Sequence, residues 1–179
     1  MMKGKHIMII KRFTTTIIFT ILLIMATPCL AITKDDLKAG GLYIGQNISE
    51  VIAMYGEPTN ESPLAGGPGG LVLTFKQNDS DKIIIYTGRQ KKSVWNFFIL
   101  NKNIPTSAGI RLGSTLNEIK EAYGTPNREY EDIRQNKTPY YLVSYTIPKE
   151  EHSQYYLKFE LENGHVVKYY IGTEEVNLT

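Results

Sequence analysis

Cysteine and histidine are scarce in this sequence, and their scarcity removes several kinds of chemistry. Among 179 residues there are 1 Cys and 3 His. A lone cysteine cannot build a disulfide framework or a thiolate metal centre. Histidine is the usual general base and a common zinc ligand, so the sequence predicts no catalytic residue, no metal site and no cofactor. An excess of positive charge is missing too, because 20 Lys+Arg face 18 Asp+Glu, and this balance argues against a nucleic-acid-binding protein.

The sequence begins with the pattern of a leader. Residues 3–12 hold four basic residues and no acid, and an apolar run of 13 residues, Phe13–Met25, follows. This pattern, with small residues before a cut, is typical of a secretory signal peptide, and we predict cleavage after Ala31. The run is short for a membrane-spanning helix, which takes about 20 apolar residues, although an uncleaved anchor is the alternative. We expect an exported protein, periplasmic or extracellular, whose mature chain (32–179) has 16 basic residues, 18 acidic residues and no cysteine.

Two segments of the mature chain, 41–61 and 109–129, match without a gap at an offset of 68 residues. The identical pairs are Gly41/Gly109, Gly45/Gly113, Glu50/Glu118, Tyr55/Tyr123, Gly56/Gly124, Pro58/Pro126 and Glu61/Glu129. Identity at a fixed offset indicates that one supersecondary unit is used twice. We therefore expect three parts: a signal peptide over 1–31, repeat unit 1 over 32–104 and repeat unit 2 over 105–179.

Each matched segment predicts a helix of about two turns. Asn47 and Thr115 stand at the N-cap position, and a glutamate three residues later completes a capping box. Glycine in a left-handed conformation and then proline are expected to end each helix. We interpret the repeated residues as structural: Gly45, Glu50, Tyr55, Gly56 and Pro58 in the first segment, and Gly113, Glu118, Tyr123, Gly124 and Pro126 in the second.

The segments between the helices predict strands, because they are rich in aromatic and β-branched residues. The expected strands are 71–76, 82–87, 94–100, 140–147, 155–161 and 165–171, with a further short one near 129–133. Asn163-Gly164 predicts a hairpin turn, and Trp95 is expected in the core. The predicted fold class is α+β, with two tandem repeats, each a short helical segment followed by a three- to four-stranded antiparallel sheet.

The repeated motif Gly-x-x-x-Gly…Glu-(Val/Ile)-x-x-x-Tyr-Gly-x-Pro, followed by a meander, resembles the SmpA/OmlA envelope domains typified by BamE. The tandem arrangement is similar to that of the β-lactamase inhibitory protein. The resemblance implies helices against one face of an antiparallel sheet and binding without catalysis. In the inhibitor-like arrangement the two units share one concave sheet, but the sequence leaves open whether the sheets join.

Tyrosine is the main positive clue to function, since all 12 tyrosines follow the leader. In the last two expected strands, Tyr and Lys alternate with apolar residues, so one sheet face should carry them. Stiff, amphipathic tyrosines suit protein binding. We predict a non-catalytic protein-binding module of the bacterial cell envelope, of assembly-factor or inhibitor type, that binds an envelope or secreted protein and touches the membrane only through its transient leader. The candidate partner-binding residues are Tyr140, Tyr156, Lys158, Lys168 and Tyr170; the alternative is that these tyrosines cover the sheet edge or pack between copies.

Two other functions remain as alternatives. A small-ligand or glycan binder would use aromatic stacking. A metal-dependent hydrolase would recruit His152 with Glu150 or Glu151, or the acidic loop around Asp79 and Asp81. The glycine-rich segment 64–70 is interpreted as a surface loop, or as a loop that becomes ordered on partner binding.

Overall fold

The computed structural model describes residues 32–65, 69–78, 81–133, 139–150 and 153–175. The predicted signal peptide and its cleavage site lie outside these ranges, as do His152, Glu151, Asp79 and the middle of the glycine-rich segment. Neither described helix is long and apolar enough to cross a membrane.

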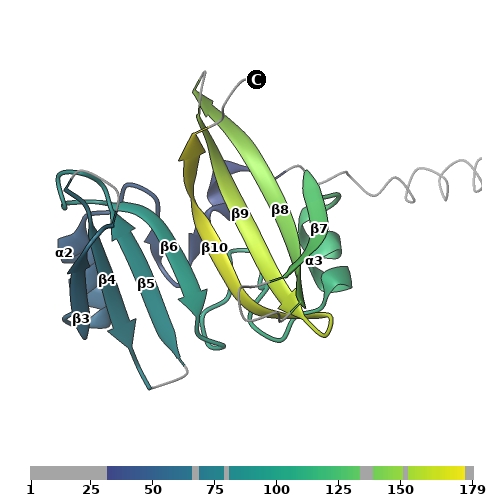
Figure 1. Cartoon of the computed structure of the whole chain (residues 1–179), viewed down its shortest axis with the longest axis horizontal. Coiled ribbons are helices and arrows are strands. Elements are labelled where there is room, and N and C mark those ends of the chain that lie inside the picture. The colour runs from purple at the N-terminus through teal and green to yellow at the C-terminus, as the bar shows by residue number, and fades with distance from the viewer. Residues whose placement is uncertain (1–31, 66–68, 79–80, 134–138, 151–152, 176–179) are drawn as a thin grey trace, which may run out of the picture.

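One eight-stranded antiparallel sheet dominates the fold (Figure 1). Its strands lie in the order β3-β4-β5-β6-β10-β9-β8-β7. Their bounds are β3 (Asn60–Pro63), β4 (Leu71–Lys76), β5 (Lys82–Thr87), β6 (Val94–Leu100), β7 (Arg128–Ile133), β8 (Pro139–Glu150), β9 (Ser153–Glu162) and β10 (His165–Glu175). The predicted α+β fold of two helix-plus-sheet repeats, each with its own three- to four-stranded sheet, is therefore wrong. The fold is mostly antiparallel sheet, and the sheet is continuous.

A seam between β6 and β10 makes the sheet continuous. Only three register pairs form it: Tyr169↔Ile99, Tyr170↔Phe98 and Ile171↔Phe97. Asn96 adds a side-chain bond across the seam, since its Oδ1 accepts the Thr173 backbone N–H at 2.8 Å. Gly172 leaves room for this contact, because a Cβ there would lie 2.2 Å from Asn96 Oδ1. Sequence alternation alone does not reveal which two strands will meet, and this is why the sequence left open whether the sheets join.

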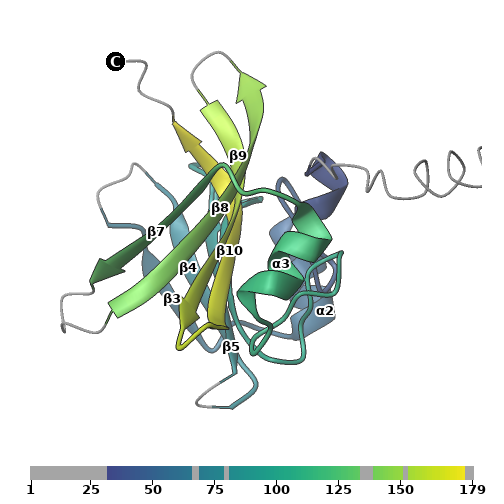
Figure 2. The same ribbon diagram turned by 90° about the vertical axis from the view of Figure 1, so that its right-hand side faces the viewer.

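The helices α2 (Ile48–Tyr55) and α3 (Leu116–Tyr123) confirm the two helices expected from the matched segments. Both lie on the same side of the sheet (Figure 2). A short 3-10 turn, η1 (Lys34–Asp36), and a two-stranded sheet of β1 (Lys38–Ala39) and β2 (Leu42–Tyr43) precede α2. The described core is a single cluster that includes residues of both helices and of strands on both sides of the seam.

The loops that enter the two helices are anchored in the same way. Gly45 N–H donates to the Val94 carbonyl at 2.8 Å, and Gly113 N–H donates to the Val166 carbonyl at 2.8 Å. Tyr55 and Tyr123 then tie the end of each helix to the chain before it. The Tyr55 hydroxyl donates to the Gly40 carbonyl, and the Tyr123 hydroxyl donates to Thr106 Oγ1 at 2.6 Å. These repeated residues hold each helix against the sheet.

The predicted capping box is confirmed at α3 and is wrong at α2. At α3, Glu118 N–H donates to Thr115 Oγ1, and the Glu118 carboxylate accepts the Thr115 backbone N–H at 2.6 Å. At α2, Asn47 Oδ1 accepts the Ser49 N–H at 3.0 Å. Glu50 accepts the Tyr43 hydroxyl at 3.4 Å and does not close a box. The asparagine side chain bonds to the second helical residue and not to the third, so α2 has a simple N-cap and neither bond of the capping box.

Glycine follows each helix as predicted, but the backbone is not in the ordinary left-handed conformation. Gly56 has φ 80° and ψ −173°, and Gly124 has φ 75° and ψ −151°. This region of backbone space is essentially open to glycine alone. Both positions therefore require glycine more strictly than a left-handed cap would.

Trp95 was expected in the core and is instead 43% exposed. The register between β5 and β6 shifts at this point: Tyr86 pairs with Asn96, and Thr87 pairs with Val94. Trp95 is the extra residue of this β-bulge, so its side chain does not follow the alternation of the strand.

Candidate functional site

The two helices cover one face of the sheet, and we call the opposite face the uncovered face (Figure 2). Strand alternation assigns side chains to it. Odd-numbered residues such as Phe159, Tyr169 and Ile171 are buried on the helix side. Their even-numbered neighbours on β9 and β10 point the other way. Among the described residues, no helix packs on this face.

One row of side chains on the uncovered face crosses all eight strands, and we call it the cross-strand row. Successive register pairs connect each residue to the next. From β3 to β7 the row is Asn60, Thr74, Ile84, Phe98, Tyr170, Lys158, Ser144 and Arg128. Its centre is apolar and aromatic, and its β7 end is cationic.

Three aromatic rings contact one another at the centre of the cross-strand row, and one of these contacts crosses the seam between β6 and β10. Phe98 lies between Tyr86 and Tyr170, with ring centroids 4.9 Å and 4.7 Å away and interplanar angles of 79° and 87°. These edge-to-face contacts are the geometry that aromatic pairs prefer. The three rings therefore form a rigid platform on the uncovered face.

Two ion pairs lie beside this platform, both on β9 and β10. Lys168 Nζ lies 2.7 Å from Glu160 Oε2, and the Tyr170 hydroxyl also donates to this carboxylate, whose residue is only 3% exposed. Lys158 pairs with Glu174, and Gln154 Nε2 donates to the second oxygen of Glu174 at 2.7 Å. Both lysines are thereby fixed in position.

The directions of the pKa shifts of Glu174 and Tyr156 agree with the contacts around the Lys158–Glu174 pair. Partial burial acts to raise the pKa of the Glu174 carboxyl, but the bonds from Lys158 and Gln154 outweigh it and hold that pKa below its ordinary value. Burial raises the pKa of Tyr156 to about 12, and the nearby Glu174 and Tyr86 add to the shift. Tyr156 therefore stays neutral, and the Lys158 ammonium lies over its ring, 4.2 Å from the centroid.

The five predicted partner-binding residues are all assigned to the uncovered face by strand alternation. Lys158, Lys168, Tyr156 and Tyr170 lie together on β9 and β10, where Tyr170 pairs with Lys158 in register. Tyr156 is only 8% exposed and supports Lys158 more than it offers surface. Tyr140 lies apart from these four, near the start of β8, and its hydroxyl donates to Asp132 at 3.0 Å.

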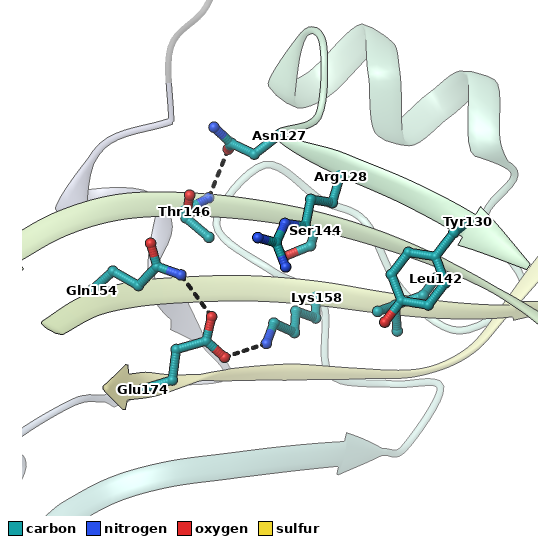
Figure 3. Close-up of a pocket in the computed structure, with 9 residues that line it drawn as sticks. All are labelled: Asn127, Arg128, Tyr130, Leu142, Ser144, Thr146, Gln154, Lys158 and Glu174. Atoms are coloured by element: carbon teal, nitrogen blue, oxygen red, sulfur yellow. Dashed lines mark hydrogen bonds and ion pairs between the residues drawn. The ribbon is translucent and has the colours of Figure 1, made fainter. Parts of the chain in front are cut away.

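Sequence reasoning missed a hollow at the β7 end of this face (Figure 3). Arg128, Ser144 and Lys158 line it along the row, and Tyr130 and Leu142 form an apolar side. Figure 3 shows Arg128 projecting over Ser144 toward the Lys158–Glu174 pair. Arg128 directly precedes the strand expected near 129–133, and no pattern in the sequence around it distinguishes it from a solvated arginine.

A second cluster surrounds the exposed Trp95. Its hollow is also lined by Arg89, Lys149 and Thr173. Sequence reasoning missed this cluster because it assigned Trp95 to the core.

Few residues of the metal sites considered as alternatives lie within the described ranges. Asp81 takes part in a turn, where its backbone N–H donates to Asn78 Oδ1 at 2.7 Å. His165 lies exposed at the hairpin, with Nδ1 2.9 Å from the Asn163 carbonyl. Within the described ranges, no group of three or more His, Cys, Asp or Glu side chains is placed to hold a metal ion.

No protein-family model matches the sequence, and no curated protein matches it either. Among solved structures, a proposed β-lactamase inhibitor protein from Streptococcus mutans is similar, with a TM-score of 0.32 and 16% identity over 84% of this chain and 91% of the other. A likeness at this level establishes neither a shared fold nor a shared function. The resemblance to BamE-like domains has no counterpart in these comparisons.

Proposed function

We propose that the protein is an exported, non-catalytic binding module that binds a partner protein through the uncovered face of its sheet. The observation that carries the proposal is the aromatic platform of Tyr86, Phe98 and Tyr170, with two fixed ion pairs beside it on β9 and β10. Aromatic anchors surrounded by ordered polar groups are typical of binding hot spots. Because these side chains are already held in place, binding would cost little conformational entropy.

Photo-cross-linking in the producing cells tests which face binds. A photoreactive residue would be placed at Ile84, on the cross-strand row, and in a separate variant at Ala53, on the exposed side of α2. We expect a discrete cross-linked protein from position 84 and none from position 53. Equal cross-linking from both positions, or none from position 84, would contradict the proposal.

Affinity for the cross-linked protein then tests the platform itself. Tyr86→Ala removes one ring of the platform, whereas Tyr43→Ala removes an exposed tyrosine on β2, away from the uncovered face. Since a hot-spot residue contributes about 2 kcal/mol or more, we expect at least a ten-fold loss for Tyr86→Ala. Tyr43→Ala should bind as the unaltered protein does. Matching melting temperatures would show that both variants are folded, and a Tyr86→Ala protein that binds normally would overturn the assignment of the platform.

A small-ligand or glycan binder is the second candidate, and one observation favours it. Trp95 is exposed beside Arg89, Lys149 and Thr173, and an exposed indole with neighbouring polar groups suits stacking against a sugar ring. Trp95 is the single tryptophan of the chain, so a change in intrinsic fluorescence on adding an oligosaccharide panel would report binding directly.

A further inference from the structure

On the uncovered face, described acidic side chains are bonded within the chain, whereas one basic side chain is not. This difference indicates the charge of the ligand that the face would bind. Three described acids on this face are bonded to partners in the chain: Glu160 to Lys168, Glu174 to Lys158, and Asp132 to Tyr140. Arg128 is different, because the structure gives its guanidinium no hydrogen bond or ion pair with any described residue. Within the described part of this face, Arg128 is thus a cation without a hydrogen-bonded partner, whereas these three acids are bonded inside the chain.

The surroundings of Arg128 make it more than a solvated arginine. It lines the hollow together with Ser144 and Lys158, its neighbours on the cross-strand row. Arg128 also lowers the pKa of Glu174 through its charge, so its positive potential reaches the floor of the hollow. An arginine fork is suited to binding a carboxylate through two parallel hydrogen bonds.

We propose that this hollow receives a carboxylate side chain from an acidic polypeptide segment of the partner. The inference rests on the proposed function and specifies the chemistry of its partner. Arg128 binds the carboxylate, and because Lys158 and Glu174, which also line the hollow, compensate each other, the described lining residues keep one net positive charge for the ligand. Tyr130 and Leu142 pack against the aliphatic part of the incoming side chain.

The cross-strand row also sets the spacing of the recognised segment. Arg128 and Phe98 lie four strand positions apart along the row. At about 4.8 Å per strand this is roughly 19 Å, which an extended chain covers in about six residues. The partner segment should therefore carry an acidic residue about six positions from an apolar residue that packs on the aromatic platform.

A peptide titration tests this without knowing the partner. The probes are fluorescent 12-residue peptides with two Glu residues placed six positions before two Phe residues, and matched peptides with Gln or Lys in place of Glu. The protein is expressed from its complete sequence and titrated up to millimolar concentration. We expect the Glu peptide to bind more tightly than the Gln peptide, and the Lys peptide to bind least.

Substitutions then assign the effect to Arg128. Loss of a charge-assisted hydrogen bond weakens binding about ten-fold, so Arg128→Gln should lose that factor for the Glu peptide and little for the Gln peptide. Arg111→Gln changes the net charge equally at an exposed loop before α3, and it should bind the Glu peptide normally. Equal losses in the two variants, equal binding of the Glu and Lys peptides, or no Glu-peptide binding would overturn the inference.

Failure of this inference is distinguishable from failure of the proposed function. If position 84 cross-links a protein but Arg128→Gln has no effect, the face binds a partner and the acidic preference is wrong. If the Glu peptide binds through Arg128 but position 84 yields no cross-link in cells, the hollow binds carboxylates and the proposed function is wrong.

Discussion

The two halves of the sheet, β3–β6 with α2 and β7–β10 with α3, are alike on the helix side and different on the uncovered face. On the helix side, equivalent loops donate equivalent hydrogen bonds to Val94 and Val166. On the uncovered face, equivalent positions of the cross-strand row differ. Asn60, Thr74, Ile84 and Phe98 of the first half correspond to Arg128, Ser144, Lys158 and Tyr170 of the second.

This difference separates the residues that the fold requires, on the helix side, from the residues that can differ between the two halves, on the uncovered face. The helix side must fill one shared core, so its residues are constrained by packing. The uncovered face has no such requirement, and in the described part of the chain the two ion pairs and the hollow all lie in its second half. Strand length follows the same division, because β8, β9 and β10 have 10 to 12 residues, whereas β4, β5 and β6 have 6 or 7. We infer that the first half supplies two of the three rings of the apolar anchor, that Tyr170 of the second half completes it, and that the second half supplies the charge recognition.

The largest expected effect comes from matched core residues at the seam. Phe97 and Tyr169 occupy equivalent positions on β6 and β10, and both are fully buried. Phe97→Ala should lower the free energy of unfolding by about 3–5 kcal/mol through the cavity it leaves. Tyr169→Ala should cost more, because the Tyr169 hydroxyl also donates to the Ile104 carbonyl at 2.9 Å and this buried acceptor would lose its partner.

Urea denaturation followed by Trp95 fluorescence and by far-UV circular dichroism measures both changes. We expect the two signals to coincide in both variants, because one core cluster spans the seam. A Phe97→Ala protein whose fluorescence transition moves ahead of its dichroism transition would show that the halves unfold separately.

The next effect tests the glycines that end the helices. Gly56→Ala and Gly124→Ala should each lower the free energy of unfolding by about 1–3 kcal/mol, because both glycines adopt a backbone conformation that other residues avoid. The two losses should be equal within the error of thermal or urea melts. Glu57→Ala, next to Gly56 and exposed, is the control, and should change stability by less than about 0.5 kcal/mol. A harmless Gly124→Ala would show that the backbone there relaxes on substitution.

Sequence reasoning performed best where the determinants are local. The ends of α2 and α3, the hairpin at Asn163-Gly164 and most strands depend on residues a few positions apart, and these were predicted. The turn is visible directly, with φ of 50° and 78° at those two residues. The assignment of Tyr170 and Lys158 to one face also follows from simple alternation.

What the sequence could not show depends on non-local pairing. The seam joins Phe97 to Ile171, residues far apart in the chain, and several apolar strands compete for the same partner. Arg128 acquires its place in the hollow only through the register of β7, β8 and β9. Trp95 was wrongly assigned to the core because a one-residue bulge reverses strand alternation. No residue pattern around Trp95 predicts the bulge.

The smallest expected effect distinguishes the two helix starts. The Thr115 backbone N–H and hydroxyl hold the pKa of the Glu118 carboxyl below its ordinary value of 4.5. The folded state therefore favours the carboxylate, and the stability this provides is complete above that ordinary value and is lost as the pH falls through the lower folded pKa. Glu118→Gln should be less stable than the unaltered protein at pH 7, and the difference should vanish at acidic pH. Glu50→Gln should have a smaller effect at pH 7, since among the described residues Glu50 accepts a hydrogen bond from the Tyr43 hydroxyl alone. Melting curves across this pH range measure both differences, and a loss in Glu118→Gln that persists in acid would show that the carboxylate charge is not what stabilises the start of α3.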